Sequence, residues 1–213
     1  MYSVGFDLDL TLADTRAGIA AVYDEVARRL GVPIDTAAVI ERLGPPLEQE
    51  LAYWLPAEEI PAAADLYRSL YPGIAVAMTT PMAGAADALA EVRGHGGRVI
   101  VVTGKNTADA RLTVETLGLD VDEVAGSVFG AAKGVAISGF GAAIYVGDHV
   151  ADIEAARAGR ALSVTVATGP YNEQALRDHG ADVVLPDLTR FGGWYNAWQV
   201  SRSLEIGAVS TVM

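Results

Sequence analysis

The stretch YSVGFDLDLTLADT, residues 2–15, is the part of the sequence on which the fold prediction rests. It begins with the apolar run VGF at residues 4–6, which has the length and composition of a buried strand. Asp7 and Asp9 follow, two residues apart. In an extended backbone, residues i and i+2 point to the same side, so both carboxylates face one spot. Two acids that converge repel each other unless a cation or a shared proton intervenes, which favours a functional reason for the pair.

The same residues also fit a purely structural reading. Asp and Thr are common in turns and at the start of helices, so Asp7, Asp9 and Thr11 would suit a capped turn. These residues alone leave the two readings open, and the rest of the chain has to decide between them.

Length and composition limit the classes of protein. The 213 residues suffice for a sizeable core, and no apolar run approaches the ~18 residues of a membrane span. The N-terminus lacks the basic and apolar regions of a signal peptide, and the absence of cysteine excludes disulfides and thiolate metal sites. The net charge of −12 disfavours nucleic acid and anionic membranes as partners. We therefore expect a cytoplasmic protein whose partners are neither nucleic acids nor membranes.

Helical spacing of apolar residues dominates the segment that follows the aspartate pair. The segment from 14 to 80 contains no convincing strand, and its helices are separated by Gly and Pro. Four helices are predicted, over residues 15–30, 36–43, 47–54 and 57–71. Residues 14–80 are therefore expected to be an all-helical unit.

After Pro81 the pattern changes to an alternation of helices and strands. Residues 98–102 (RVIVV) and 142–146 (AAIYV) are apolar runs typical of buried parallel strands. Such alternation predicts an α/β fold, in which a parallel sheet that includes the first strand has helices on both faces. The further strands are expected at 127–129, 161–166 and 182–185, and the helices at 84–94, 107–117 and 149–158.

Polar residues gather at the carboxyl ends of these predicted strands. In open α/β sheets the ligand crevice lies outside those ends. Carboxylate oxygens there suit Mg²⁺, and a lysine beside them suits a phosphate. The residues concerned are Asp7, Asp9, Thr103, Gly104, Lys105, Lys133, Asp148 and Asp152.

The ordered set of these motifs resembles a known family. DLDLT (7–11), VVTGK (101–105), Lys133 and GDHVAD (147–152) resemble the four motifs of the haloacid dehalogenase (HAD) superfamily. TPMAGAADALAEV (80–92) is similar to the return from cap to core in its phosphoglycolate phosphatase-like branch. The resemblance implies a Rossmann-like three-layer core, residues 1–13 and 81–213, and an inserted helical cap of the C1 type, residues 14–80.

The resemblance also implies a role for each motif residue. Asp7 is the expected nucleophile, which becomes an aspartyl phosphate, and Asp9 the expected general acid and base. Dehalogenases lack an acid at the second position, because halide leaves without a proton, so Asp9 favours phosphate esters. The implied Mg²⁺ ligands are Asp7, the backbone carbonyl of Asp9 and Asp148, with Asp152 in support, and the implied phosphate ligands are Thr103, Gly104 and Lys133.

The function expected on this basis is a Mg²⁺-dependent phosphatase of small soluble phosphomonoesters, phosphoglycolate-like or other phosphorylated metabolites. A phosphomutase of the same superfamily and a non-catalytic phosphate-binding protein are the alternatives. The expected partner is the substrate alone, and the protein is expected to be a monomer or a homodimer. Lys133 is the predicted phosphate-binding lysine, and Lys105 is expected to turn outward to solvent. The alternative is that Lys105 takes over because Lys133 and Asp148 are only 15 residues apart.

Overall fold

A six-stranded parallel sheet forms the centre of the computed structural model, which describes residues 2–210 and the side chains up to Leu204. The strand order is β5-β4-β1-β6-β7-β8, so the chain winds outward from β1 to β5 and then continues on the other side of β1. The winding reverses between β1 and β6, the position at which open α/β sheets bind ligands. The strands are β1 (Ser3–Phe6), β4 (Arg98–Val102), β5 (Glu123–Ala125), β6 (Ala142–Gly147), β7 (Leu162–Val166) and β8 (Val183–Leu185).

Helices cover both faces of this sheet because side chains alternate along the strands. In β4, Val99 and Val101 belong to a core cluster on one face, whereas Ile100 and Val102 belong to a cluster on the other. The first face packs against α5 (Ala85–Gly94), α6 (Thr107–Thr116) and α10 (Phe191–Ser210), and the second against α7 (Lys133–Gly139) and α8 (Val150–Ala158). The expected three-layer α/β core is confirmed. A further helix, α9 (Glu173–Asp178), precedes β8.

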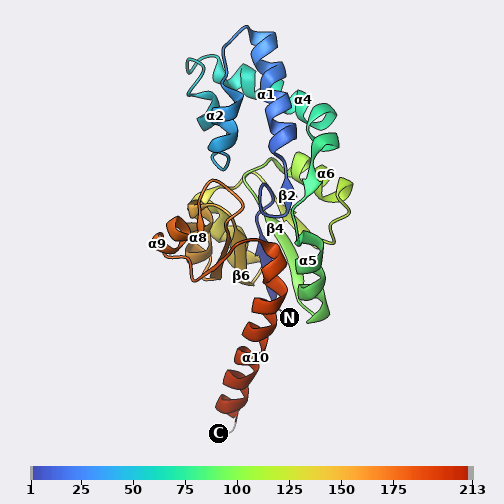
Figure 1. Cartoon of the computed structure of the whole chain (residues 1–213), viewed down its shortest axis with the longest axis vertical. Helices are drawn as coiled ribbons and strands as arrows, with labels where there is room; N and C mark the ends of the chain where they lie inside the picture. The colour runs from blue at the N-terminus through green and yellow to red at the C-terminus, as the bar shows by residue number, and fades with distance from the viewer. Residues whose placement is uncertain (1, 211–213) are drawn as a thin grey trace.

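The segment between β1 and β4 forms a helical unit with an apolar cluster of its own. Its helices gather beyond one end of the sheet (Figure 1). The two connections to the sheet pair with each other as a short antiparallel ribbon of β2 (Ala13–Asp14) and β3 (Thr80–Pro81). The helices of this unit are α1 (Arg16–Leu30), α2 (Thr36–Glu41), α3 (Leu47–Leu51) and α4 (Ile60–Ile74), followed by the 3₁₀ helix η1 (Val76–Met78). Two further 3₁₀ helices belong to the core, η2 (Gly130–Ala132) and η3 (Leu188–Arg190).

Several predicted elements differ from the observed ones. The strand expected at 127–129 lies instead at Glu123–Ala125, and Ser127 has a positive φ of 62° that no strand allows. Helix α4 continues through Pro72 to Ile74, although proline has no N–H to donate within a helix. The ribbon of β2 and β3 is an unpredicted pair of strands at the ends of the helical segment.

The C-terminal part of the chain forms the long helix α10, which the sequence did not predict. Trp194 and Trp198 pack partly buried against the main core. The helix then projects from the body at the end opposite the helical unit (Figure 1). Residues 1 and 211–213 of the expected core lie outside the described residues. Within the described part of the chain, no helix has the length and apolar character needed to cross a membrane.

Candidate active site

Asp7 and Asp9 lie on a tight turn at the carboxyl end of β1. The backbone N–H of Asp7 still donates to Val146 of β6, at 2.8 Å, and the chain then folds back through Leu12, whose N–H bonds to the Leu8 carbonyl. Leu10 completes the turn with a φ of +59°, a conformation that costs a branched side chain free energy. Both carboxylates line the same pocket. The turn therefore holds the two acids toward one space, as the spacing predicts.

Lys133 lies beneath Asp7 at the start of helix α7. Its Nζ is 3.1 Å from Oδ1 of Asp7 and 2.7 Å from Oδ1 of Asp152, and only 2% of the residue is exposed. Burial alone lowers the pKa of Lys133, but Asp152 and Asp7 raise it, and the pKa lies well above its ordinary value. Lys133 is therefore a buried ammonium in direct contact with the predicted nucleophile. The short connection to β6 is filled by α7 and does not draw it away.

Asp148 and Asp152 reach the same space from the end of β6 and the first turn of α8. Asp148 accepts a 2.7 Å hydrogen bond from the hydroxyl of Thr11. Gly147 leaves room for Asp152, because a Cβ at residue 147 would lie 2.3 Å from a carboxylate oxygen of Asp152. Gly169 does the same for Asp148, at 1.9 Å. Two glycines thus allow two buried carboxylates to approach the turn after β1.

This arrangement crowds three carboxylates around one point. Oxygen atoms of Asp7, Asp148 and Asp152 all lie within 4.8 Å of one another. Burial, opposed by Lys133 and reinforced by the other acids, raises the pKa of Asp7 to about 6. Burial and the charges of Asp152 and Asp7 raise the pKa of Asp148 well above its ordinary value. A divalent cation relieves both effects, because it favours the ionised form of each carboxylate.

Thr103 and Gly104 follow the end of β4 and line the same pocket. Thr103 is 1% exposed, and its hydroxyl accepts a 3.3 Å hydrogen bond from the backbone N–H of Lys105. Asn106 then caps α6 by accepting from the N–H of Asp109 at 2.9 Å. The predicted phosphate residues therefore stand beside the carboxylates, on a loop fixed by its own hydrogen bonds.

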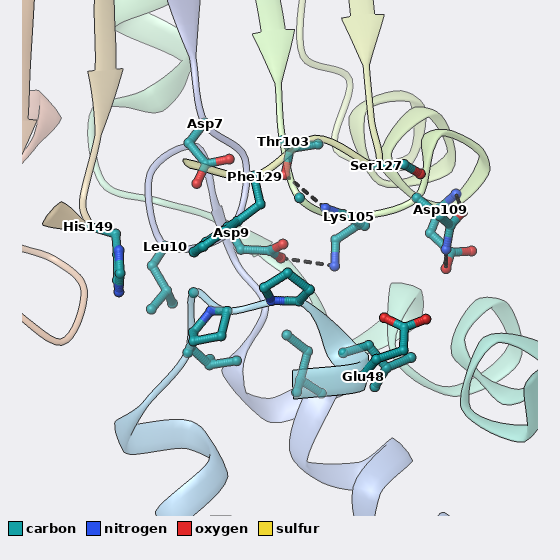
Figure 2. Close-up of a pocket in the computed structure, with 18 of the residues that line it drawn as sticks. Asp7, Asp9, Leu10, Glu48, Thr103, Lys105, Asp109, Ser127, Phe129 and His149 are labelled. Carbon is teal, nitrogen blue, oxygen red and sulfur yellow. Dashed lines mark hydrogen bonds and ion pairs between the residues drawn. The ribbon is translucent and has the colours of Figure 1, made fainter. Parts of the chain in front are cut away.

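Lys105 also lies inside the site, so the expectation that it turns outward to solvent is wrong. Figure 2 shows its ammonium beside the Asp9 carboxylate, and the distance from Nζ to Oδ1 is 3.0 Å. Nζ also lies 4.3 Å from the ring centroid of Tyr71, a residue of α4 in the helical unit. Only 8% of the Lys105 side chain is exposed. The sequence could not reveal this, because Tyr71 reaches Lys105 only through the placement of the helical unit on the core.

Thr11 is a second residue whose contribution the sequence did not identify. The alternation of the DLDLT motif gave a signal, since Thr11 continues the series of Asp7 and Asp9 at intervals of two. The chain turns after Asp9, however, and Thr11 is fully buried with its hydroxyl bonded to Asp148. Thr11 therefore orients the Asp148 carboxylate through this hydrogen bond and does not line the pocket.

The pocket above these residues is a cavity of about 360 Å³ between the core and the helical unit. The core supplies acids and lysines, and the helical unit supplies mostly apolar and aromatic surface. The loop of the helical unit that contains Gly44 approaches the core closely, because a Cβ at Gly44 would lie 2.6 Å from the ring of His149. The lining from the helical unit consists of Ile19, Tyr23, Leu43, Gly44, Pro45, Pro46, Leu47, Glu48, Tyr67, Arg68 and Tyr71.

Family models and curated relatives match this chain over most of its length. A model described as haloacid dehalogenase-like hydrolase matches residues 4–126, and a HAD-hydrolase-like model matches residues 125–191. The chain is 27% identical over 214 residues to phosphoglycolate phosphatase of Caulobacter vibrioides, and the match covers 86% of each protein. It is 26% identical over 178 residues to the tyrosine-protein kinase PtkA of Mycobacterium tuberculosis, which covers 77% of this chain. The chain spans 61% of the length of that kinase.

Solved structures share the whole architecture. A haloacid dehalogenase-like family hydrolase from Streptococcus pneumoniae superposes with a TM-score of 0.81 at 24% sequence identity. The superposition covers 92% of this chain and 98% of the other. The expected combination of a parallel core and a helical cap is therefore a fold already known from experiment.

Proposed function

Because the chain belongs to the haloacid dehalogenase-like hydrolases, we propose that it is a Mg²⁺-dependent phosphatase of small phosphomonoesters. The observation that carries the proposal is the pairing of Asp7 and Asp9 at one pocket, with Lys133 in contact with Asp7. An anionic nucleophile approaches an anionic phosphate only where cations offset the repulsion. The buried lysine supplies one such cation.

The residues present also fit a bound divalent cation. The oxygens of Asp7, Asp148 and Asp152 lie close enough to share one, and carboxylates are the ligands that Mg²⁺ prefers. Asp7 and Asp148 would hold the ion together with the backbone carbonyl of Asp9, and Asp152 would support them. When bound, the ion offsets the charge of the phosphoryl oxygens and of the nucleophile. Lys133 would offset part of the same negative charge, and Thr103 and Gly104 would bind the phosphoryl group.

The chemistry of the proposed reaction belongs to the two aspartates. An oxygen of Asp7 attacks phosphorus, the bond from phosphorus to the alcohol oxygen breaks with its electron pair, and Asp9 gives that oxygen a proton. Asp7 is then an aspartyl phosphate. Water attacks the same phosphorus, Asp9 takes the proton of the water, and the electron pair of the broken bond returns to Asp7. Inorganic phosphate leaves, and both aspartates regain their starting states.

We further propose that residues 14–80 act as a cap that selects the substrate. The cavity lies between this segment and the core, and the leaving group would therefore lie against the aromatic and apolar side chains of the cap. A volume of about 360 Å³ suits a phosphorylated metabolite. Phosphoglycolate-like compounds enter the proposal because a curated relative is a phosphoglycolate phosphatase.

A second candidate is transfer of the phosphoryl group to a tyrosine hydroxyl instead of water. The relative named as a tyrosine-protein kinase favours it, although the match covers only 61% of that protein. Incubation with labelled ATP and a tyrosine-containing polymer tests this candidate, and label in the polymer would support it. Conversion of a sugar 1-phosphate to its isomer without release of phosphate would support the phosphomutase.

The phosphatase itself is tested with Mg²⁺, an aryl phosphate and a panel of phosphorylated metabolites. We expect Asp7→Asn to abolish both turnover and an acid-stable phosphoenzyme. Asp9→Asn should keep the fold and slow turnover at least ~10²-fold, the usual contribution of a general acid and base. Near-normal turnover by Asp7→Asn would refute the covalent mechanism. An inactive parent, with every compound and with Mg²⁺ present, would refute the phosphatase.

A further inference from the structure

The chain contains only two lysines, and both line the same pocket. The other basic side chains, apart from the histidines, are thirteen arginines. Lysine is therefore rare in this chain, and the presence of both lysines at one pocket calls for an explanation. Lys133 has a role in the proposed reaction, because it contacts Asp7 and Asp152. Lys105 has none so far, although it is nearly as well enclosed.

Lys105 stands between the core and the cap. Its ammonium lies 3.0 Å from Oδ1 of Asp9, in the core, and 4.3 Å from the ring centroid of Tyr71, in the cap. A cation over an aromatic face is attracted to it, more so where water is excluded. Tyr71 is itself 1% exposed. One side chain therefore touches both the proposed acid–base residue and the element that covers it.

We propose that Lys105 is a positioning residue that couples closure of the cap to the placement of the Asp9 carboxylate. The inference rests on the proposed function. With Tyr71 over it, Lys105 is shielded from water, and its attraction to Asp9 is that of a poorly solvated pair. When the cap moves away, water surrounds the ammonium and weakens the attraction several-fold. Asp9 is then held in one orientation only while the substrate is covered.

This arrangement assigns the two lysines different tasks. Lys133 contacts Asp7, the proposed nucleophile, whereas Lys105 contacts Asp9, the proposed acid and base. Loss of Lys105 should therefore affect the rate more than the binding of phosphate. The ion pair needs Asp9 in its ionised form, the form that takes the proton of water, so hydrolysis of the aspartyl phosphate should slow most.

The first test uses the fact that the chain has only two lysines. The intact protein is acetylated with an N-hydroxysuccinimide ester, and mass spectrometry follows Lys105 and Lys133 separately. Tyr71→Leu should raise the rate at Lys105 about tenfold, as expected for loss of a buried contact, and leave Lys133 unchanged. Tyr23→Leu is the matched control, because Tyr23 is a buried tyrosine of the cap that lines the pocket. It should change neither rate.

An unchanged rate at Lys105 in folded Tyr71→Leu would overturn the coupling, and so would an equal rise in Tyr23→Leu. Circular dichroism and thermal unfolding establish that each variant is folded. Wild-type protein gives a second measurement that needs no substitution. Lys105 should react more slowly in the folded protein than in the same protein unfolded in urea, and equal rates would also refute the enclosure.

The second test is a double-mutant cycle on kcat and KM with the best substrate found. Lys105→Met should lower kcat roughly 10- to 100-fold with KM within about threefold, and Lys105→Arg should restore most of it, since arginine also pairs with carboxylates and stacks on aromatic rings. Lys105→Met combined with Tyr71→Leu should be no slower than Lys105→Met alone. Independent, multiplicative losses would refute the coupling. If no substrate is found, the proposed function fails while the acetylation test still decides the coupling.

Discussion

Replacement of Lys133 by methionine tests how the site tolerates its three carboxylates. Lys133 is 2% exposed, and its Nζ lies 3.1 Å from Asp7 and 2.7 Å from Asp152. Methionine keeps the apolar stem and removes the charge. Removing one partner of a buried ion pair costs ~3–5 kcal/mol, because the other partner stays buried without compensation. For a chain of this size that corresponds to a fall in Tm of roughly 6–20 °C.

The loss should depend on pH in a defined direction. Burial raises the folded pKa of Asp7 to about 6, from an ordinary value of 3.8, even with Lys133 present. A raised pKa means that the contribution of Asp7 to stability is full below 3.8 and is lost as the pH rises through 6. Lys133 lowers the pKa of both Asp7 and Asp148. Its removal therefore raises both pKa values and extends to higher pH the range over which stability is lost. Each unit by which these pKa values rise adds ~1.4 kcal/mol of instability at neutral pH.

Urea unfolding in EDTA, followed by tryptophan fluorescence, measures the effect at pH 5.0 and pH 7.5. We expect the larger loss at pH 7.5 and a partial recovery there when Mg²⁺ is added. Arg177→Met is the control, because its 2.9 Å pair with Glu173 is half-exposed and should be worth under ~1 kcal/mol. A loss below ~1 kcal/mol for Lys133→Met, or the same loss at both pH values, would refute the account of the site.

Two further predictions concern the metal and the packing of the cap. Mg²⁺ should activate, EDTA should inactivate and Ca²⁺ should inhibit. Ca²⁺ takes more ligands at longer distance, so it would engage both oxygens of Asp7 and leave neither to attack phosphorus. Equal rates with the two ions would contradict this. Gly18→Ala should destabilise the protein by ~1–3 kcal/mol, since its Cβ would lie 2.5 Å from the carbonyl oxygen of Ala75. Thermal unfolding measures that loss, and an unchanged Tm would show that the contact relaxes without cost.

The sequence predicted the sheet and the placement of the acids well for a physical reason. Parallel strands are buried on both faces and therefore appear as apolar runs, as at Arg98–Val102. Their carboxyl ends share one edge, so Asp7 and Asp148 had to lie near each other once both strands were recognised. The strand near 127 was misplaced because β5 is an edge strand with a partly exposed pattern, while the apolar residues beyond it belong to a loop.

The contacts that the sequence did not predict join segments far apart in the chain. Tyr71 meets Lys105 because the cap lies on the core, and no local pattern encodes that placement. Gly169 matters only because Asp148 occupies the space where a side chain would stand. Such relations depend on tertiary packing, which residue spacing within one element cannot express.

The ribbon of Ala13–Asp14 and Thr80–Pro81 limits how the cap can move. Two separate linkers would let the helical unit twist, slide and tilt independently. Here the outgoing and returning chains are hydrogen-bonded side by side, so neither changes length or direction without the other. We expect this paired ribbon to bend more easily than it twists, because both chains would have to rotate together. We therefore expect the cap to open along one path and to return each time to the same position, with Tyr71 over Lys105.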